Sequence, residues 1–248
     1  MTHFDTTPDA TRRTVPSSND AILGRFSGIK ILVIGDFMLD RFVWGHVDRI
    51  SPEAPVPVVR VSRESLKPGG AGNVANNIRA LGGQVTCAGL IGDDEAASYL
   101  KTSFKNAGIQ TGGLVTDPNY ETITKTRIIA HNQQVVRLDI EPTYPISPRT
   151  RERIQRYVKH QIHRFDVCIV SDYGKGVVDS NILAFLAAHK LRKNFVYVID
   201  PKRENFAHYK GASLIKPNQT EASEALHTTI TNQMDIEDAG PLLLQMWD

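Results

Sequence analysis

A glycine-rich turn is the part of the sequence whose residue types best suit ligand binding. Gly69, Gly70 and Gly72 stand just ahead of Asn73, where a helical pattern begins. Glycine lets the backbone approach a ligand closely, and the N–H groups at a helix start attract polar or anionic atoms. The amide of Asn73 can bond a hydroxyl group. The turn therefore predicts a binding loop, with an ordinary turn before a helix as the alternative.

Acidic residues follow three apolar segments that have the composition of buried strands. Asp36 and Asp40 follow the first segment, Asp172 follows the second and Asp200 ends the third. In parallel sheets, ligands bind at the carboxyl ends of the strands. A shared rim of acids predicts a ligand rich in hydroxyl groups, and the alternative is that acids merely favour turns. Lys175, between two glycines, is a candidate for binding a phosphate group.

A second candidate binding segment starts a later helix. Asn218 is a good N-cap, and Glu221 stands three residues further on, which is the spacing of a capping box. A purely structural cap is therefore one interpretation of this segment. The functional interpretation is that Asn218 and Glu221 face the phosphates of a nucleotide through Mg²⁺ and water.

Strand and helix patterns alternate along the chain, which indicates a doubly wound, mostly parallel α/β sheet. Residues 1–28 are predicted to be a mobile tail with a short helix over 20–26, and 29–248 one domain. Strands are predicted at residues 29–35, 84–91, 165–171, 195–200 and 213–215. Helices are predicted at residues 71–81, 95–107, 147–163, 180–193, 218–226 and 235–247.

Two stretches, at about 41–63 and 120–141, do not fit this alternation. The first is β-prone but carries several prolines, and the second alternates polar and apolar residues. Alternation is typical of strands with one solvated face. We expect the two stretches to form a small β-lid over the binding crevice, which would exclude water from a reaction site.

Composition and charge exclude several classes of protein. The chain has 248 residues, 41% of them hydrophobic and 23% charged, with a formal charge of +2, so no nucleic-acid partner is expected. Its two cysteines, Cys87 and Cys168, are too few for a disulfide framework. Neither an apolar run of membrane-spanning length nor a secretory h-region is present, so we expect a cytoplasmic protein without a membrane partner.

Together these motifs resemble the ribokinase-type (PfkB) carbohydrate kinases over residues 29 to 224. The resemblance rests on Gly69-Gly70-Ala71 with Asn73, Ala75, Gly82 and Gly92 at the spacing of that family's signature. The segments 35–40, 51–57, 171–176 and 200–202 are similar to the branch that phosphorylates D-glycero-β-D-manno-heptose 7-phosphate at C1. That branch supplies ADP-heptose for lipopolysaccharide.

The resemblance implies MgATP as phosphoryl donor and a homodimer formed through the lid. It also implies that Asp40 binds sugar hydroxyls, that Gly69, Gly70 and Asn73 form the sugar loop, and that Asp172 and Lys175 lie beside the sugar phosphate. Residues Asn218, Gln219, Thr220 and Glu221 match the element that organises ATP phosphates, with Glu221 serving Mg²⁺. Arg127 and Arg137 on the lid are candidates for the 7-phosphate, since arginine binds phosphate bidentately.

One departure from the family concerns its catalytic loop, Gly-Ala-Gly-Asp, for which the sequence has no counterpart. We therefore assign no catalytic base, expect it beyond Asp248, and expect a chain truncated at its C-terminus. A kinase for another sugar or sugar phosphate, or a non-catalytic sugar-phosphate-binding homologue, is the alternative.

Overall fold

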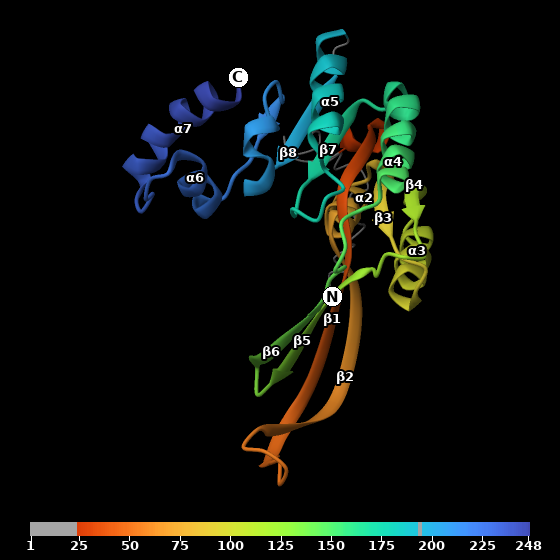
Figure 1. Cartoon of the computed structure of the whole chain (residues 1–248), viewed down its shortest axis with the longest axis vertical. Coiled ribbons are helices and arrows are strands. Elements are labelled where there is room, and N and C mark those ends of the chain that lie inside the picture. Colours follow the sequence, from red (N-terminus) through yellow and green to blue (C-terminus); the bar gives the residue numbers. More distant parts are fainter. Residues whose placement is uncertain (1–23, 193–194) are drawn as a thin grey trace, which may run out of the picture.

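The body of the protein is a parallel sheet covered by helices on both faces, as the computed structural model of residues 24–192 and 195–248 shows (Figure 1). The strands lie in the order β4-β3-β1-β7-β8-β9, and neighbouring strands are parallel. The predicted α/β fold is therefore confirmed. The strands are β1 (Lys30–Ile50), β3 (Gln84–Ile91), β4 (Gln110–Thr116), β7 (Val167–Ser171), β8 (Val196–Asp200) and β9 (Leu214–Ile215).

The first strand is much longer than the sequence predicts. The prediction that it ends at Gly35 is wrong, because β1 runs on to Ile50. Up to Asp36 it pairs with β3 and β7, and from Phe37 onward it pairs with the strands of the lid. A Cβ atom at Gly35 would lie 2.1 Å from the carbonyl oxygen of Ser171. The glycine therefore lets two strands approach closely where β1 leaves the body, and it does not end the strand.

The lid is built around the second half of β1 and extends away from the body (Figure 1). There β1 pairs antiparallel with β2 (Pro57–Gly70) and parallel with β5 (Ile123–Ala130), which pairs antiparallel with β6 (Gln133–Ile140). Most residues of these strands come from the two stretches that break the helix–strand alternation. The lid and the body therefore share one continuous strand.

Helices cover the two faces of the body and bury separate apolar cores. Helices α2 (Ala71–Ala80) and α3 (Glu95–Asn106) cover one face, whereas α4 (Pro148–Gln161) and α5 (Ser180–Arg192) cover the other. Alternate residues of β1 enter different cores, with Val33 in the first and Leu32 in the second. A strand buried on both faces has to be apolar throughout, which explains the continuous apolar run at its start.

The strand order reverses direction between β1 and β7. From β1 the chain adds β3 and β4 on one side, and from β7 it adds β8 and β9 on the other. Such a switch point leaves a crevice at the carboxyl ends of the two central strands, where ligands of open α/β sheets bind. The lid leaves the body at this same edge, because it continues β1.

The last two helices, α6 (Gln219–Leu226) and α7 (Gln233–Trp247), pack against each other beyond β9. Trp247 is buried, and its Nε1 donates a hydrogen bond to the carbonyl oxygen of Phe206 at 3.0 Å. The predicted C-terminal helix is confirmed, and its Trp247 packs on Phe206 and Tyr209.

Strand β4 was not predicted, since it contains Gly112 and Gly113, which are poor strand formers. The predicted helix over 20–26 lies mostly outside the described residues. None of the helices within residues 24–192 and 195–248 has the length and apolar character needed to span a membrane.

Candidate active site

The acids that follow the apolar segments meet at one edge of the sheet. Gly35 pairs with Ser171, and Ser171 pairs with Asp200. Gly35, Ser171 and Asp200 therefore form one row across β1, β7 and β8. Asp36 and Asp172 each follow a member of this row by one residue, so Asp36, Asp172 and Asp200 lie on neighbouring strands at the same edge of the sheet. The sequence prediction that they share an edge is confirmed, although their side chains have different partners.

Asp36 lies beneath the loop that follows β7 and holds it in place. Its side chain is only 1% exposed and accepts hydrogen bonds from the backbone N–H groups of Tyr173 at 2.9 Å, Lys175 at 3.2 Å and Val177 at 3.4 Å. Burial raises its pKa to about 6, although these N–H groups lower it. Asp36 therefore shapes the loop that carries Lys175, and its carboxylate is not open to a ligand.

Asp172 is also buried, and its carboxylate is directed into the protein. It accepts hydrogen bonds from the hydroxyl of Tyr209 at 2.7 Å, the amide of Asn205 at 2.7 Å and the N–H of Gly174 at 2.8 Å. Burial raises the pKa of Asp172, and the three donors lower it. This residue connects the loop after β7 to the segment after β8, beside the position predicted for the sugar phosphate.

The glycine turn lies directly against Asp40. A Cβ atom at Gly69 would come within 2.3 Å of a carboxylate oxygen of Asp40, so any larger residue there would displace that carboxylate. Gly70 has a φ of 55° and stands at the N-cap of α2, where it adds no side chain over the first-turn N–H groups. Asn73, in the first turn, is exposed. The fold therefore brings together the residues predicted for the sugar loop and the acid predicted for sugar hydroxyls.

Arg127 faces Asp40 from the neighbouring strand of the lid. Its Nη1 lies 2.5 Å from the Asp40 carboxylate, and its guanidinium carbon lies 5.3 Å from the centre of the Phe42 ring. Arg137 is the cross-strand partner of Arg127, so both side chains start on the same face of the lid. The Arg137 guanidinium, however, bonds to Asp139 at 3.0 Å rather than to Asp40.

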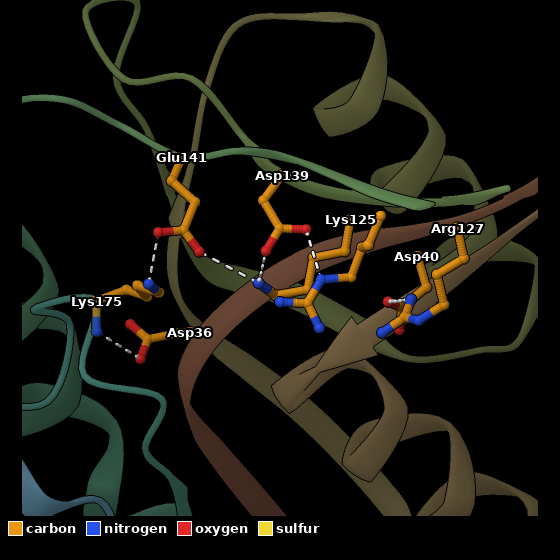
Figure 2. Close-up of polar contacts among 8 residues, drawn as sticks. Asp36, Asp40, Lys125, Arg127, Asp139, Glu141 and Lys175 are labelled. Atoms are coloured by element: carbon orange, nitrogen blue, oxygen red, sulfur yellow. Dashed lines mark hydrogen bonds and ion pairs between the residues drawn. The ribbon is translucent and has the colours of Figure 1, made fainter. Parts of the chain in front are cut away.

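A chain of ion pairs joins this face of the lid to the body, as Figure 2 shows. Lys125 lies 3.1 Å from Asp139 and 3.2 Å from Glu141, and Glu141 lies 2.7 Å from Lys175. The hydrogen bond from Lys175 is the largest of the effects that lower the pKa of Glu141. Lys125, Asp139 and Glu141 were missed in the sequence, because contacts that depend on strand register give no motif. They fix Lys175 relative to the lid.

The Glu141–Lys175 bridge should contribute measurably to stability. We expect Glu141→Gln and Lys175→Gln each to lower the free energy of unfolding. In a double-mutant cycle the two substitutions should show a coupling energy of about 1 kcal/mol, because both groups are partly shielded from water. The coupling should disappear as the pH falls through the lowered pKa of Glu141, where its charge is lost. Urea unfolding of the two single variants and the double variant measures it.

The exposed pair Arg156–Glu152 on α4 is the matched control for this bridge. The same cycle there should give at most about 0.5 kcal/mol. Equal coupling in the two pairs, or none at Glu141–Lys175, would mean that the lid and the loop after β7 are not joined by this contact.

The segment predicted for ATP phosphates begins α6 at the same edge of the sheet. Asn218 and Glu221 form a reciprocal capping box, in which Oδ1 of Asn218 accepts from the N–H of Glu221 at 2.9 Å and Oε2 of Glu221 accepts from the N–H of Asn218 at 2.8 Å. The Gln219 amide donates to the carbonyl of Ile230, and Thr220 is exposed. The structural interpretation of the motif is therefore correct as far as the cap is concerned.

The functional interpretation of this segment, that it faces a nucleotide through Mg²⁺, stays a prediction. Asp200, which ends β8, pairs with Lys216 at 3.1 Å just before the cap. Among the described residues no group of three acidic, histidine or cysteine side chains could hold a metal ion. Mg²⁺ usually keeps several waters and binds through one or two carboxylates together with substrate phosphates. Glu221, whose second carboxylate oxygen accepts no described hydrogen bond, fits a metal that arrives with ATP rather than a resident ion.

Comparisons with known proteins agree with this geometry. The model of the pfkB family of carbohydrate kinases matches residues 29–246. The chain is 42% identical over 225 residues to the bifunctional protein HldE of Trichlorobacter lovleyi, and 43% identical over 229 residues to that of Geobacter sulfurreducens. These alignments cover 91% and 92% of this chain but only 46% and 47% of the relatives. The chain thus spans about half the length of the curated relatives that it matches.

Solved structures of sugar kinases have the same fold. Phosphofructokinase-2 from Escherichia coli in complex with potassium superposes with a TM-score of 0.66 at 17% identity, covering 88% of this chain and 70% of the other. Arabidopsis thaliana ribokinase complexed with ribose and ATP gives a TM-score of 0.63 at 13% identity, covering 88% and 69%. A switch point between β1 and β7, a glycine turn at the start of α2, a lid and a family match over most of the chain lead to one conclusion: the chain belongs to the pfkB family of carbohydrate kinases.

Proposed function

We propose that this chain binds D-glycero-β-D-manno-heptose 7-phosphate and MgATP and phosphorylates the sugar at C1, on the route to ADP-heptose. The observation that carries the proposal is the contact between the Asp40 carboxylate and the backbone of Gly69 at the start of α2. The carboxylate offers acceptors to sugar hydroxyls, and the N–H groups of the helix N-terminus beside it offer donors to anionic oxygens.

The charge of the lid face supports a phosphorylated sugar. Lys125, Arg127, Arg137 and Lys175 lie there with the carboxylates of Asp40, Asp139 and Glu141. Four cations and three carboxylates leave one net positive charge in the cluster. This net charge favours an anionic group, although a phosphate that binds one of these cations has to share it with the carboxylate that the cation already contacts. Arg127 and Arg137 remain our candidates for the 7-phosphate.

The residues of this chain would contribute mainly positioning. Asp40 and the glycine turn would orient the sugar, the N–H groups of α2 would favour negative charge, and the lid would exclude water. Residues 218–221 would contact the phosphates of ATP, whose Mg²⁺ neutralises charge on the transferred group. We assign no general base among the described residues.

A panel of sugars tests the substrate. In the presence of an ATP analogue and Mg²⁺, heptose 7-phosphate should bind at least about tenfold more tightly than ribose, which has no phosphate for the cations, and than fructose 6-phosphate, whose shorter chain places its phosphate differently relative to its hydroxyl groups. Calorimetry gives the dissociation constants, and a coupled assay with ATP gives turnover. Tighter binding or faster turnover of fructose 6-phosphate or ribose would favour a kinase for another sugar. Tight heptose phosphate binding without any turnover would support the substrate and would be consistent both with the non-catalytic alternative and with a kinase that lacks its general base, so binding rather than turnover decides the substrate.

The other face of the lid supports our proposal of a homodimer. Side chains of a strand alternate between faces, so Val136, Leu138 and Ile140 lie opposite Arg137 and Asp139. All three are exposed, Leu138 to 53%. An exposed apolar strip on a projecting sheet is typical of an interaction surface. Sedimentation of the chain as a monomer across the micromolar range would argue against this assembly.

A further inference from the structure

A cavity at the opposite edge of the sheet has the composition of an anion site. It has a volume of about 400 Å³ and lies where β1, β3 and β4 begin, next to the ends of α2 and α4. The sugar crevice lies at the carboxyl ends of the strands, so the cavity is separated from it by the length of the sheet. A volume of this size is typical of a site for a small metabolite.

Three cations from separate elements line this cavity. Lys30 starts β1, Arg79 lies in the last turn of α2, and Arg164 belongs to the 3-10 helix that follows α4. No acidic side chain of the described residues lines it. Asp166 lies nearby, but one of its oxygens accepts the backbone N–H of Lys30 at 2.8 Å.

Positive charge at this edge also has a structural role, because it offsets the negative ends of helices. The helices α2, α3 and α4 all end here, and each helix end carries about half a negative charge. The Nε of Arg79 donates to the carbonyl of Ala107 at 2.9 Å, which is a C-terminal contact of this kind. Three full positive charges still slightly exceed the half-charges of three helix ends and the charge of the nearby Asp166 taken together, so a small positive excess remains.

The neutral side chains of the lining suit a polar ligand. The amides of Gln84, Gln110 and Gln161 and the phenol of Tyr157 line it. Tyr157 packs against Gly112, whose Cβ position would be 3.3 Å from the tyrosine hydroxyl. Amides and a hydroxyl can each donate and accept hydrogen bonds, so these side chains can bind the hydroxyl groups of a small organic ligand.

From this arrangement we infer that the cavity at the amino ends of β1, β3 and β4 binds a small phosphate monoester, with Lys30, Arg79 and Arg164 holding the phosphate. Arginine binds phosphate with two parallel hydrogen bonds, and the two arginines and the lysine come from three different elements that line the cavity. The inference does not depend on which sugar the crevice accepts.

Titration of the full chain with inorganic phosphate and with glycerol 3-phosphate, followed by amide NMR, tests the site. The amides of Gly108 and Gly112 should shift in a saturable manner, and glycerol 3-phosphate should bind more tightly because the glutamines can reach its hydroxyls. Arg79→Gln combined with Arg164→Gln should weaken binding by about tenfold or more, because charge-assisted hydrogen bonds are lost. Arg164→Gln alone leaves the bond from Arg79 to Ala107 intact and should still weaken binding severalfold if the double variant is unstable.

Two controls separate this site from others. Lys175→Gln, in the sugar crevice, and Arg149→Gln, exposed at the other end of α4, should leave the shifts at Gly108 and Gly112 unchanged. Loss of these shifts in Lys175→Gln, their persistence in the double variant, or the absence of saturation at millimolar phosphate would each overturn the inference. None of these results bears on the sugar panel, so the two proposals can fail separately.

Discussion

Replacing Asp40 by asparagine should weaken heptose 7-phosphate binding by about 100-fold or more. The carboxylate lies against Gly69 at the start of α2, where it can accept hydrogen bonds from two sugar hydroxyls, and such charge-assisted bonds each contribute about 1.5–3 kcal/mol. The variant also removes the ion-pair partner of Arg127, whose guanidinium is then free to change position. Calorimetry with the sugar phosphate measures the loss, and the affinity for an ATP analogue should change little.

Asp48→Asn is the matched control, since Asp48 is also on β1 and also pairs with an arginine, Arg60, but in an exposed part of the lid. It should alter sugar affinity by less than about twofold, as expected for an exposed pair. If Asp40→Asn binds the sugar as tightly as the wild type does, Asp40 is a structural partner of Arg127 and the sugar site lies elsewhere.

The second large effect is a dependence of stability on pH that comes from Asp36. Burial raises its pKa from 3.8 to about 6, so the folded protein holds this proton where the unfolded chain has released it. Its favourable contribution is therefore complete below about pH 4 and is lost as the pH rises to about 6. The difference is about 3 kcal/mol. Asp36→Asn cannot titrate, so the stability advantage of the wild type over this variant should shrink by that amount between pH 4 and pH 7.

Urea unfolding of both proteins across this pH range measures the difference. Asp172 contributes to the raised pKa of Asp36 and is present in both proteins, so only the difference between the two proteins is diagnostic. Asp238→Asn, at an exposed position of α7, should give a profile parallel to that of the wild type. Parallel profiles for Asp36→Asn as well would show that Asp36 is not protonated in the folded protein at pH 5.

The register of the lid hairpin shows why part of the site could not be predicted. The turn at His131 and Asn132 has positive φ at both residues, as in a tight two-residue hairpin. Counted from this turn alone, Lys125 would face Leu138. A bulge between Ile128 and Ile129 shifts the pairing, so that Lys125 faces Asp139 and Arg127 faces Arg137. A shift of one residue exchanges the two faces of a strand, and the alternating sequence has no marker for it.

The residues predicted for the sugar loop differ in how much the sequence revealed about them. The spacing of Gly69, Gly70 and Asn73 predicted a turn at a helix start, and the structure has α2 there. Asp40 was predicted as an acid after a strand, whereas it lies within β1 because that strand passes from the body into the lid. Its contact with Gly69 depends on the pairing of β1 with β2, which joins residues about thirty positions apart.

The sequence by itself determined the α/β class, most helix and strand bounds, the two lid stretches and the acids at the edge of the sheet. These follow from local periodicity, capping residues and glycines, all of which act within a few positions. Only the tertiary structure decided that Asp36 is buried beneath the loop of Lys175, that Glu141 joins that loop to the lid, and that three cations meet at the amino ends of the strands. The physical reason is that burial, ion pairing and cavities depend on which distant segments pack together, and strand register and close approach at single glycines determine that packing.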